Sequence, residues 1–327
     1  MSIIASFGRA ALCAAGIAVS AVSPSSAQSG FPQKDITFIV PWNAGGSNDV
    51  AARALDPILR EHGIKLVIEN VPGATGVIGM KRVASSAPDG YVIGMGTSST
   101  LALIAQNKAS GLTNANFTHI ARVSTDPLML LVPSTSAIKS LSDYIANMKS
   151  RPGKVTIGTP GSYNLNHIFA SMTARAAGVE YVNVPYTGGS KVVADLIGQH
   201  VDSGVLKPSE TLGQIQEKLL TPIGIFANER LEMFPEVPTF KERGFDVFPY
   251  GPVVQMAYVV GPAELPNDVR TKLVTAFRAA IQDPRFKEFA KKNVFLVDDL
   301  TGDALTKEVD SVAVAIGKVA AQTFPKE

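Results

Sequence analysis

A strand that runs through a glycine turn straight into a helix constrains this chain more than any other feature. The stretch is Asp35–Leu55. Its first residues form a short apolar run, which is typical of a buried strand. The pair Gly45–Gly46 permits backbone angles and close approaches that a side chain would block. Because each residue of Ser47–Asp49 is a favourable N-cap, we expect the helix to begin near Val50.

A helix N-terminus after such a turn is suited to bind an anion. Its first N–H groups have no carbonyl partner, and they carry the positive end of the helix dipole. The pair Gly45–Gly46 alone could form only a tight turn, but Trp42 before it and the capping residues after it favour ligand contact. Asp49 would repel a carboxylate, so we expect its side chain to cap the helix and hold the loop in place.

The N-terminus has the pattern of a secretory signal peptide. Arg9 precedes the apolar stretch Ala10–Val22, and Ser25–Ala27 supplies the small residues that a signal peptidase recognises. A retained membrane anchor is the alternative, but the apolar stretch is short for a bilayer span. We therefore predict that residues 1–27 are a cleaved signal peptide and that the mature protein is secreted.

Composition argues against a nucleic-acid partner and against a metal or redox centre. The chain is 46% hydrophobic and 18% charged, with a net charge of +2. Lys and Arg are not clustered as in a nucleic-acid footprint. The single cysteine, Cys13, lies in the predicted signal peptide, and the four histidines are far apart in the sequence. The sequence therefore predicts no metal site and no cofactor.

Strand-like and helix-like runs alternate along the chain, which predicts an α/β fold with a mainly parallel sheet and helices on both faces. The pattern of strand, Gly/Ser-rich turn and helix recurs at Ile39–Val50, Ile157–Phe169 and Val184–Lys191. Two similar lobes with facing turns would place a ligand between them, because open α/β sheets bind ligands at the carboxyl ends of strands. The last part differs, since Asn267–Thr323 predicts three consecutive amphipathic helices.

Sequence signatures of common enzymes are not found. No histidine pair has HExxH spacing, no serine lies in a Gly-x-Ser-x-Gly elbow, and the glycine turn has neither dinucleotide-binding nor P-loop order. We therefore expect that the protein is not an enzyme. A spatial triad is invisible to sequence, so a periplasmic hydrolase of a carboxylated substrate stays an alternative.

Six ordered motifs resemble the Bug (TctC-like) solute-binding receptors of tripartite tricarboxylate transporters, and the resemblance extends from about Phe31 to the end of the chain. The motifs are Pro41–Asp49, Val67–Gly79, Ala87–Tyr91, Gly161–His167, Val184–Gly189 and Pro235–Thr239. Six motifs in order are far more specific than one glycine turn.

The resemblance implies that the secreted protein is periplasmic. It also implies a two-domain periplasmic-binding-protein fold, a type II-like Venus flytrap whose α/β domains are joined by crossing strands. It implies that 28–126 and 253–327 form domain 1 and that 127–252 forms domain 2. It also implies a small carboxylate ligand held between the domains, partly through backbone N–H groups. The implied partners are that ligand and, transiently, the subunits of a membrane transporter, and we expect a monomer.

The resemblance also indicates which residues contact the ligand, and the position of one lysine adds another. The predicted set is Trp42, Asn43, Ala44, Gly45, Gly46, Asn48, Asp49, Thr97 and Ser98 on the first lobe, and Ser162, Tyr163, His167, Thr187 and Lys207 on the second. Two departures from the family leave undetermined which residues contact the far end of the ligand. Thr187 stands where many relatives carry lysine, and residues 204–208 lack the commonest form of that segment. Lys207 could be a solvated loop residue or could pair with a second carboxylate of the ligand.

Several of these residues have a plain structural alternative. Ser162 and Thr187 could be ordinary loop residues, and His167 could be a half-buried histidine with an internal partner. Trp42 and Tyr163 could pack against the protein or cover an apolar ligand body. The sequence predicts a receptor that delivers a carboxylate to a transporter, with a periplasmic sensor acting on a two-component sensor kinase as the alternative. The ligand's identity stays open among carboxylates, amino acids, aromatic acids and amides.

Overall fold

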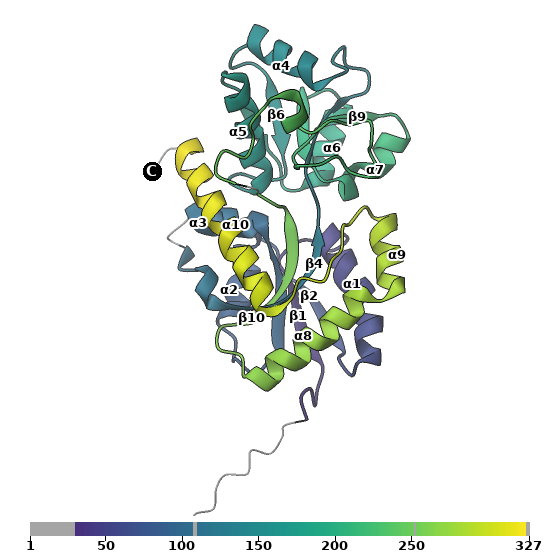
Figure 1. The fold of residues 1–327 in the computed structure, drawn as a ribbon, viewed down its shortest axis with the longest axis vertical. Coiled ribbons are helices and arrows are strands. Elements are labelled where there is room, and N and C mark those ends of the chain that lie inside the picture. The colour runs from purple at the N-terminus through teal and green to yellow at the C-terminus, as the bar shows by residue number, and fades with distance from the viewer. Residues whose placement is uncertain (1–29, 107–109, 252, 325–327) are drawn as a thin grey trace, which may run out of the picture. The chain divides into compact units, whose positions relative to one another are not determined.

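The computed structural model describes residues 30–106, 110–251 and 253–324, and the chain from Phe31 onward forms one compact unit (Figure 1). The predicted signal peptide, residues 1–27, lies outside the described residues. Two five-stranded sheets organise the compact unit. We call the elements around the two sheets the first lobe and the second lobe.

The first lobe is built on a sheet of strand order β2-β1-β3-β10-β4. The strands are β1 (Ile36–Val40), β2 (Leu66–Asn70), β3 (Val92–Thr97), β4 (Phe117–Thr125) and β10 (Met256–Pro262). The helices are α1 (Ser47–Glu61), α2 (Val77–Ala84), α3 (Ser98–Gln106), α8 (Asn267–Gln282), α9 (Pro284–Lys292) and α10 (Gly302–Thr323). Phe38 belongs to the apolar cluster that includes residues of α1 and α8, whereas its neighbour Ile39 belongs to the cluster that includes residues of α2, α3 and α10. Helices therefore cover both faces of this sheet.

The second lobe is built on a sheet of strand order β7-β6-β8-β5-β9. The strands are β5 (Met129–Pro133), β6 (Thr156–Thr159), β7 (Val182–Pro185), β8 (Ser203–Leu206) and β9 (Leu220–Ile225). The helices are α4 (Leu141–Ser150), α5 (Leu165–Ala177), α6 (Gly189–Ile197) and α7 (Pro208–Gln216). Leu130 and Leu131 are both fully buried and belong to two different apolar clusters. Alternate side chains of β5 thus bury opposite faces of this sheet as well.

In each sheet four strands run in one direction and the fifth runs in the other. β10 is antiparallel to β3 and β4, and β5 is antiparallel to β8 and β9. The pairs of β1 with β2 and β3, and of β6 with β7 and β8, are parallel. The reversed strand is in each case the one that the chain enters after leaving the other lobe. The predicted α/β fold is confirmed, but strand–helix alternation does not predict these antiparallel pairs.

The C-terminal helix α10 contacts both lobes. It packs against α3 of the first lobe and α5 of the second, and Figure 1 shows it in yellow beside α3. Arg175 of α5 donates a hydrogen bond from Nη1 to Gln322 Oε1 at 2.7 Å. The ring of Phe324, at the C-cap of α10, lies 4.6 Å from the ring of His167 between centroids. The three predicted C-terminal helices are therefore present, and the last of them links the lobes.

Candidate functional site

The turn before α1 has a different geometry from the predicted one. The helix begins at Ser47, three residues before the expected start near Val50, so that expectation is wrong. Gly46 is the N-cap and has an ordinary extended conformation, with φ −75° and ψ 163°. The left-handed residue is Gly45, whose φ is +78°. Gly46 is confined in another way, because a Cβ there would lie 3.3 Å from the carbonyl oxygen of Asn43.

Asp49 explains why the helix starts early. It lies in the first turn and is not an N-cap, and one carboxylate oxygen reaches back to accept the Gly45 N–H at 2.9 Å. The carboxylate also accepts from Arg53 Nε and from Asn70 Nδ2, both at 3.0 Å. Burial raises the pKa of Asp49, but these hydrogen bonds outweigh it and hold the pKa below its ordinary value. Asp49 therefore holds the loop, as the sequence suggests.

Lys207 connects the second lobe to this helix N-terminus. It is the residue before α7, and it is only 9% exposed, so it is not a solvated loop residue. Its ammonium donates to Ser47 Oγ, in the first turn of α1, at 3.1 Å. The same nitrogen lies 3.6 Å from Asp126 Oδ2. A buried cation therefore stands beside the first turn of α1, where the backbone N–H groups have no carbonyl of a preceding turn to bond.

Asp126 is a buried carboxyl group that sequence reasoning missed. It follows β4, where the chain crosses to the second lobe, and it is 3% exposed. Its Oδ2 accepts from Ser209 Oγ at 3.1 Å, while its Oδ1 is buried without a hydrogen-bond partner among the described residues. Burial raises the pKa of Asp126 to about 7, although the charge of Lys207 opposes the rise. The sequence did offer one signal, because Asp126 is a polar residue between two apolar strands, where the chain crosses from the first lobe to the second.

Glu210 is a second missed acid, and it lies at the N-terminus of α6. A Cβ on Gly189, the first residue of α6, would come within 2.9 Å of the Glu210 carboxyl carbon. Glu210 also lies in the first turn of α7, where its carboxylate accepts the backbone N–H of Lys207 at 3.5 Å. The order Lys207-Pro208-x-Glu210, with proline at the first helical position, could have predicted that a helix begins here and that Glu210 lies in its first turn.

The polar residues at the start of α3 have partners within the protein. Thr97 and Ser98 are almost completely buried, and Ser98 is the first residue of α3 and not part of an open turn. Ser98 Oγ donates to the carbonyl of Val254 at 2.6 Å and accepts from Met256 N at 3.2 Å. Thr97 Oγ1 accepts from Thr100 N at 3.2 Å. The Ser98 hydroxyl therefore joins α3 to the segment that leads into β10, and the Thr97 hydroxyl bonds within the first turn of α3.

A second contact between the lobes lies near the turn before α5. Thr75 has the left-handed φ of 51°, and its Oγ1 lies 3.7 Å from the position of a Cβ on Gly161 in the second lobe. The next residue, Gly76, lies against Trp42, whose ring would be 3.4 Å from a Cβ there. Trp42 Nε1 is buried and has no hydrogen-bond partner in the described part of the chain. Trp42 thus offers an unused donor on the first-lobe side of this contact.

Tyr163 and His167 face the C-terminal end of α10. The Tyr163 backbone has φ 58°, its N–H donates to His167 Nδ1 at 3.0 Å, and its carbonyl accepts from Gln106 Nε2 at 2.9 Å. Both rings pack on Phe324. Burial lowers the pKa of His167 to about 4, so the imidazole is neutral at pH 7 and can accept this hydrogen bond. His167 therefore has the internal partner that the structural alternative expects.

The other predicted contact residues carry no hydrogen bond from their side chains in the described part of the protein. Asn43, Ala44 and Thr187 are exposed, Ser162 is half-buried and Asn48 is buried. Their contact with a ligand stays a prediction.

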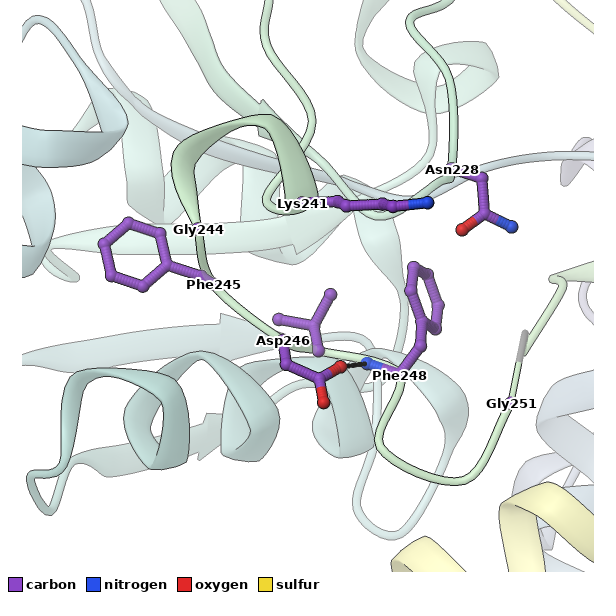
Figure 2. Close-up of a pocket in the computed structure, with 8 residues that line it drawn as sticks. Asn228, Lys241, Gly244, Phe245, Asp246, Phe248 and Gly251 are labelled. Carbon is purple, nitrogen blue, oxygen red and sulfur yellow. Dashed lines mark hydrogen bonds between the residues drawn. The ribbon is translucent and has the colours of Figure 1, made fainter.

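Two cavities lie away from all of these residues. One, of about 390 Å³, lies on the loops that follow β9, and Figure 2 shows Asp246 there accepting the N–H of Phe248 at 2.9 Å. It is lined by Asn228, Lys241, Gly244, Phe245, Asp246, Val247, Phe248 and Gly251. The other, of about 610 Å³, lies between α7 and α9. Neither cavity contains a residue of the predicted site.

Within the ranges that the structure describes, no helix is long and apolar enough to cross a bilayer. The same ranges contain no group of three or more His, Cys, Asp or Glu side chains arranged to hold a metal ion.

Similar folds among solved structures define the class as two-lobe periplasmic binding proteins. The structure of the periplasmic binding protein BugD has a TM-score of 0.80 at 25% identity and covers 90% of this chain and 98% of BugD. The structure of MatC from Rhodopseudomonas palustris with bound malate has a TM-score of 0.80 at 24% identity, covering 88% of this chain and 99% of MatC. The predicted fold is confirmed.

The family follows from the sequence. The profile of the family described as "Tripartite tricarboxylate transporter family receptor" matches residues 50–309. The "UPF0065 protein in gbd 5'region" of Cupriavidus necator is 32% identical over 287 residues, which cover 87% of this chain and 86% of that protein. Protein BugT of Bordetella pertussis is 31% identical over 245 residues, 74% of each chain. This chain belongs to the tripartite tricarboxylate transporter family of receptors.

Proposed function

We propose that this chain is a periplasmic solute-binding receptor that captures a small carboxylate between its lobes and delivers it to a tripartite tricarboxylate-type membrane transporter. The observation that carries the proposal is the buried ammonium of Lys207 in the second lobe, which lies beside the first turn of α1 in the first. A cation next to a helix N-terminus is a favourable environment for a carboxylate. Membership of a receptor family supports the same function.

In this proposal the ligand's carboxylate accepts hydrogen bonds from the backbone N–H groups of Ser47–Asp49 and from Lys207. The turn 42–49 and the residues Ser162 and Thr187 line the same site. The lobes act as domains with the bounds 28–126 with 253–327, and 127–252. The chain crossing after β4 and the reversed strand β10 support these bounds.

The remaining predicted residues shape the site in this proposal. Thr97 and Ser98 support its first-lobe wall, since their hydroxyl groups have partners in the protein. Tyr163 and His167 hold the turn before α5 against Phe324.

A thermal-shift screen of small carboxylates and their amides, followed by calorimetric titration, tests binding. A ligand at a hundredfold excess over its Kd should stabilise the folded protein by about 2.7 kcal/mol, which raises the unfolding temperature measurably. A panel of mono-, di- and tricarboxylates, aromatic acids and amino acids in which no member shifts the unfolding temperature would contradict the proposal.

Two further measurements test delivery and location. Deletion of the gene should abolish uptake of the radiolabelled ligand that the screen identifies, and uptake at the wild-type rate would exclude a role in transport. N-terminal sequencing of the exported protein should begin near residue 28. A mature chain that still begins at Met1 would contradict the predicted signal peptide.

A further inference from the structure

The two glycine turns of similar sequence have opposite charges beside them. The turn before α1 lies beside the Lys207 ammonium, through the hydrogen bond to Ser47. The turn before α6 lies beside the Glu210 carboxyl group, which is in van der Waals contact range of Gly189. A carboxylate at a helix N-terminus satisfies the dipole of that helix. The N-terminus of α6 therefore already has an anion from the protein itself.

Asp126 adds a second acid next to the same lysine. One of its oxygens is 3.6 Å from Lys207 Nζ and accepts from Ser209. Its other oxygen is buried and has no hydrogen-bond partner in the described residues. Buried polar atoms in native proteins are nearly always hydrogen-bonded, so this oxygen calls for a donor from water or from a ligand. An approaching carboxylate carries no hydrogen to donate.

The balance of charge around Lys207 sets a limit on the ligand. Asp126 lies 3.6 Å from the Lys207 ammonium, and Glu210 accepts the backbone N–H of Lys207 and acts on Asp126 through its charge. The ammonium and the N-terminus of α1 can together receive one ligand carboxylate. Above about pH 7, where Asp126 is ionised, a second ligand carboxylate directed to the second lobe would meet the two acids, and juxtaposed like charges disfavour binding strongly.

We propose that Asp126 and Glu210 select a ligand that has one carboxylate and, at its far end, a hydrogen-bond donor such as an amide or ammonium group, over the corresponding dicarboxylate. This inference rests on the proposed function, and it assigns to Asp126 and Glu210 the recognition of the ligand's far end. Thr187, a neutral and exposed residue in the turn before α6, adds no cation that would offset the two acids.

Matched pairs of acids test the selection. Calorimetry at pH 8, where Asp126 is ionised, would compare succinate, glutarate and adipate with their half-amides, which have the same chain and one carboxylate fewer. For the chain length that binds most tightly, the wild-type protein should bind the half-amide at least about tenfold more tightly than the dicarboxylate. Glu210→Gln and Asp126→Asn should each reduce this ratio several-fold, because each variant keeps the shape and removes the charge.

Glu217→Gln is the matched control. Glu217 follows the same helix α7, is exposed, and gives the same change in net charge. The ratio of half-amide affinity to dicarboxylate affinity in Glu217→Gln should equal that of the wild type. A wild-type preference for the dicarboxylate, or a ratio that neither Glu210→Gln nor Asp126→Asn changes, would overturn the inference and leave the proposed carboxylate receptor intact. If no acid or half-amide of this set binds, the inference fails, whereas the proposed function depends on the broader carboxylate screen.

Discussion

The turns before α1 and α6 have almost the same sequence, Ala44-Gly45-Gly46-Ser47 and Thr187-Gly188-Gly189-Ser190, yet they face opposite charges. The N-terminus of α7 supplies both charges, since Lys207 precedes α7 and Glu210 lies in its first turn. The lysine contacts the first turn of α1, and the glutamate contacts the first residue of α6. A local pattern thus predicts that a helix follows the turn, but the anion that its N-terminus receives depends on side chains from elsewhere.

The largest expected effect comes from removing the lysine. Lys207→Met should weaken carboxylate binding by roughly tenfold to a hundredfold, since a charge-assisted hydrogen bond contributes about 1.5–3 kcal/mol. It should also destabilise the fold, because Asp126 keeps a buried carboxyl group without its cation. The measurements are calorimetry and urea denaturation.

Two further variants separate the two effects of that substitution. Lys207→Met with Asp126→Asn should recover stability without recovering affinity. Lys191→Met, an exposed position on α6, is the control and should bind as the wild type does. Full affinity in Lys207→Met would show that the α1 turn does not use this cation.

The pH dependence of the unfolding free energy should reveal the raised pKa of Asp126. Its pKa is raised from 3.8 to about 7 in the folded protein, so the folded state holds a proton that the unfolded state has released between these values. The unfolding free energy that this group contributes is present below about pH 4 and is lost as the pH rises to 7. The stability of wild type minus that of Asp126→Asn should therefore fall between pH 4 and pH 7. A difference that is flat or rises over this range would contradict the assignment.

A smaller effect distinguishes the two glycines before α1. Gly45→Ala should lower the free energy of unfolding by about 1–2 kcal/mol, because Gly45 has φ +78°, a conformation that disfavours a Cβ. Gly46→Ala should cost less, since its φ of −75° suits any residue and only the approach to Asn43 O is tight. Urea denaturation of both variants compares them. A larger loss in Gly46→Ala would reverse the roles that the structure gives these residues.

The smallest effect is expected at the matching turn of the second lobe. Gly189→Ala would place a Cβ against the Glu210 carboxyl group, which is the end of a flexible side chain and can move. The unfolding free energy should therefore change by less than about 1 kcal/mol. A loss similar to that of Gly45→Ala would show that Glu210 is held rigidly at the N-terminus of α6.

The sequence predicts the parts of this protein that local chemistry determines. The strand before the first turn, the helix after it and the role of Asp49 as a loop anchor follow from residue types within a few positions of one another. The contact of Lys207 with Ser47 joins residues 160 positions apart, and no local pattern indicates it. Asp126 was missed for the same reason, because its importance arises only where the two lobes bring it beside Lys207 and Ser209.

The helix start near Val50 was wrong for a related reason. Three adjacent capping residues predict a start but do not distinguish which position is used. The hydrogen bond from Gly45 N–H to Asp49 Oδ2 selects Gly46 as the N-cap. The direction of β10 likewise depends on the chain's return from the second lobe and not on its own residues.

The most direct test of the proposed site is a crystal structure of the protein with a carboxylate from the ligand screen. One carboxylate of that ligand should lie within hydrogen-bond distance of Lys207 Nζ and of the first-turn N–H groups of α1, with its other end toward Asp126 and Glu210. A ligand bound elsewhere, for example in the cavity lined by Lys241 and Phe248, with Lys207 still on Ser47, would contradict the assignment of the site.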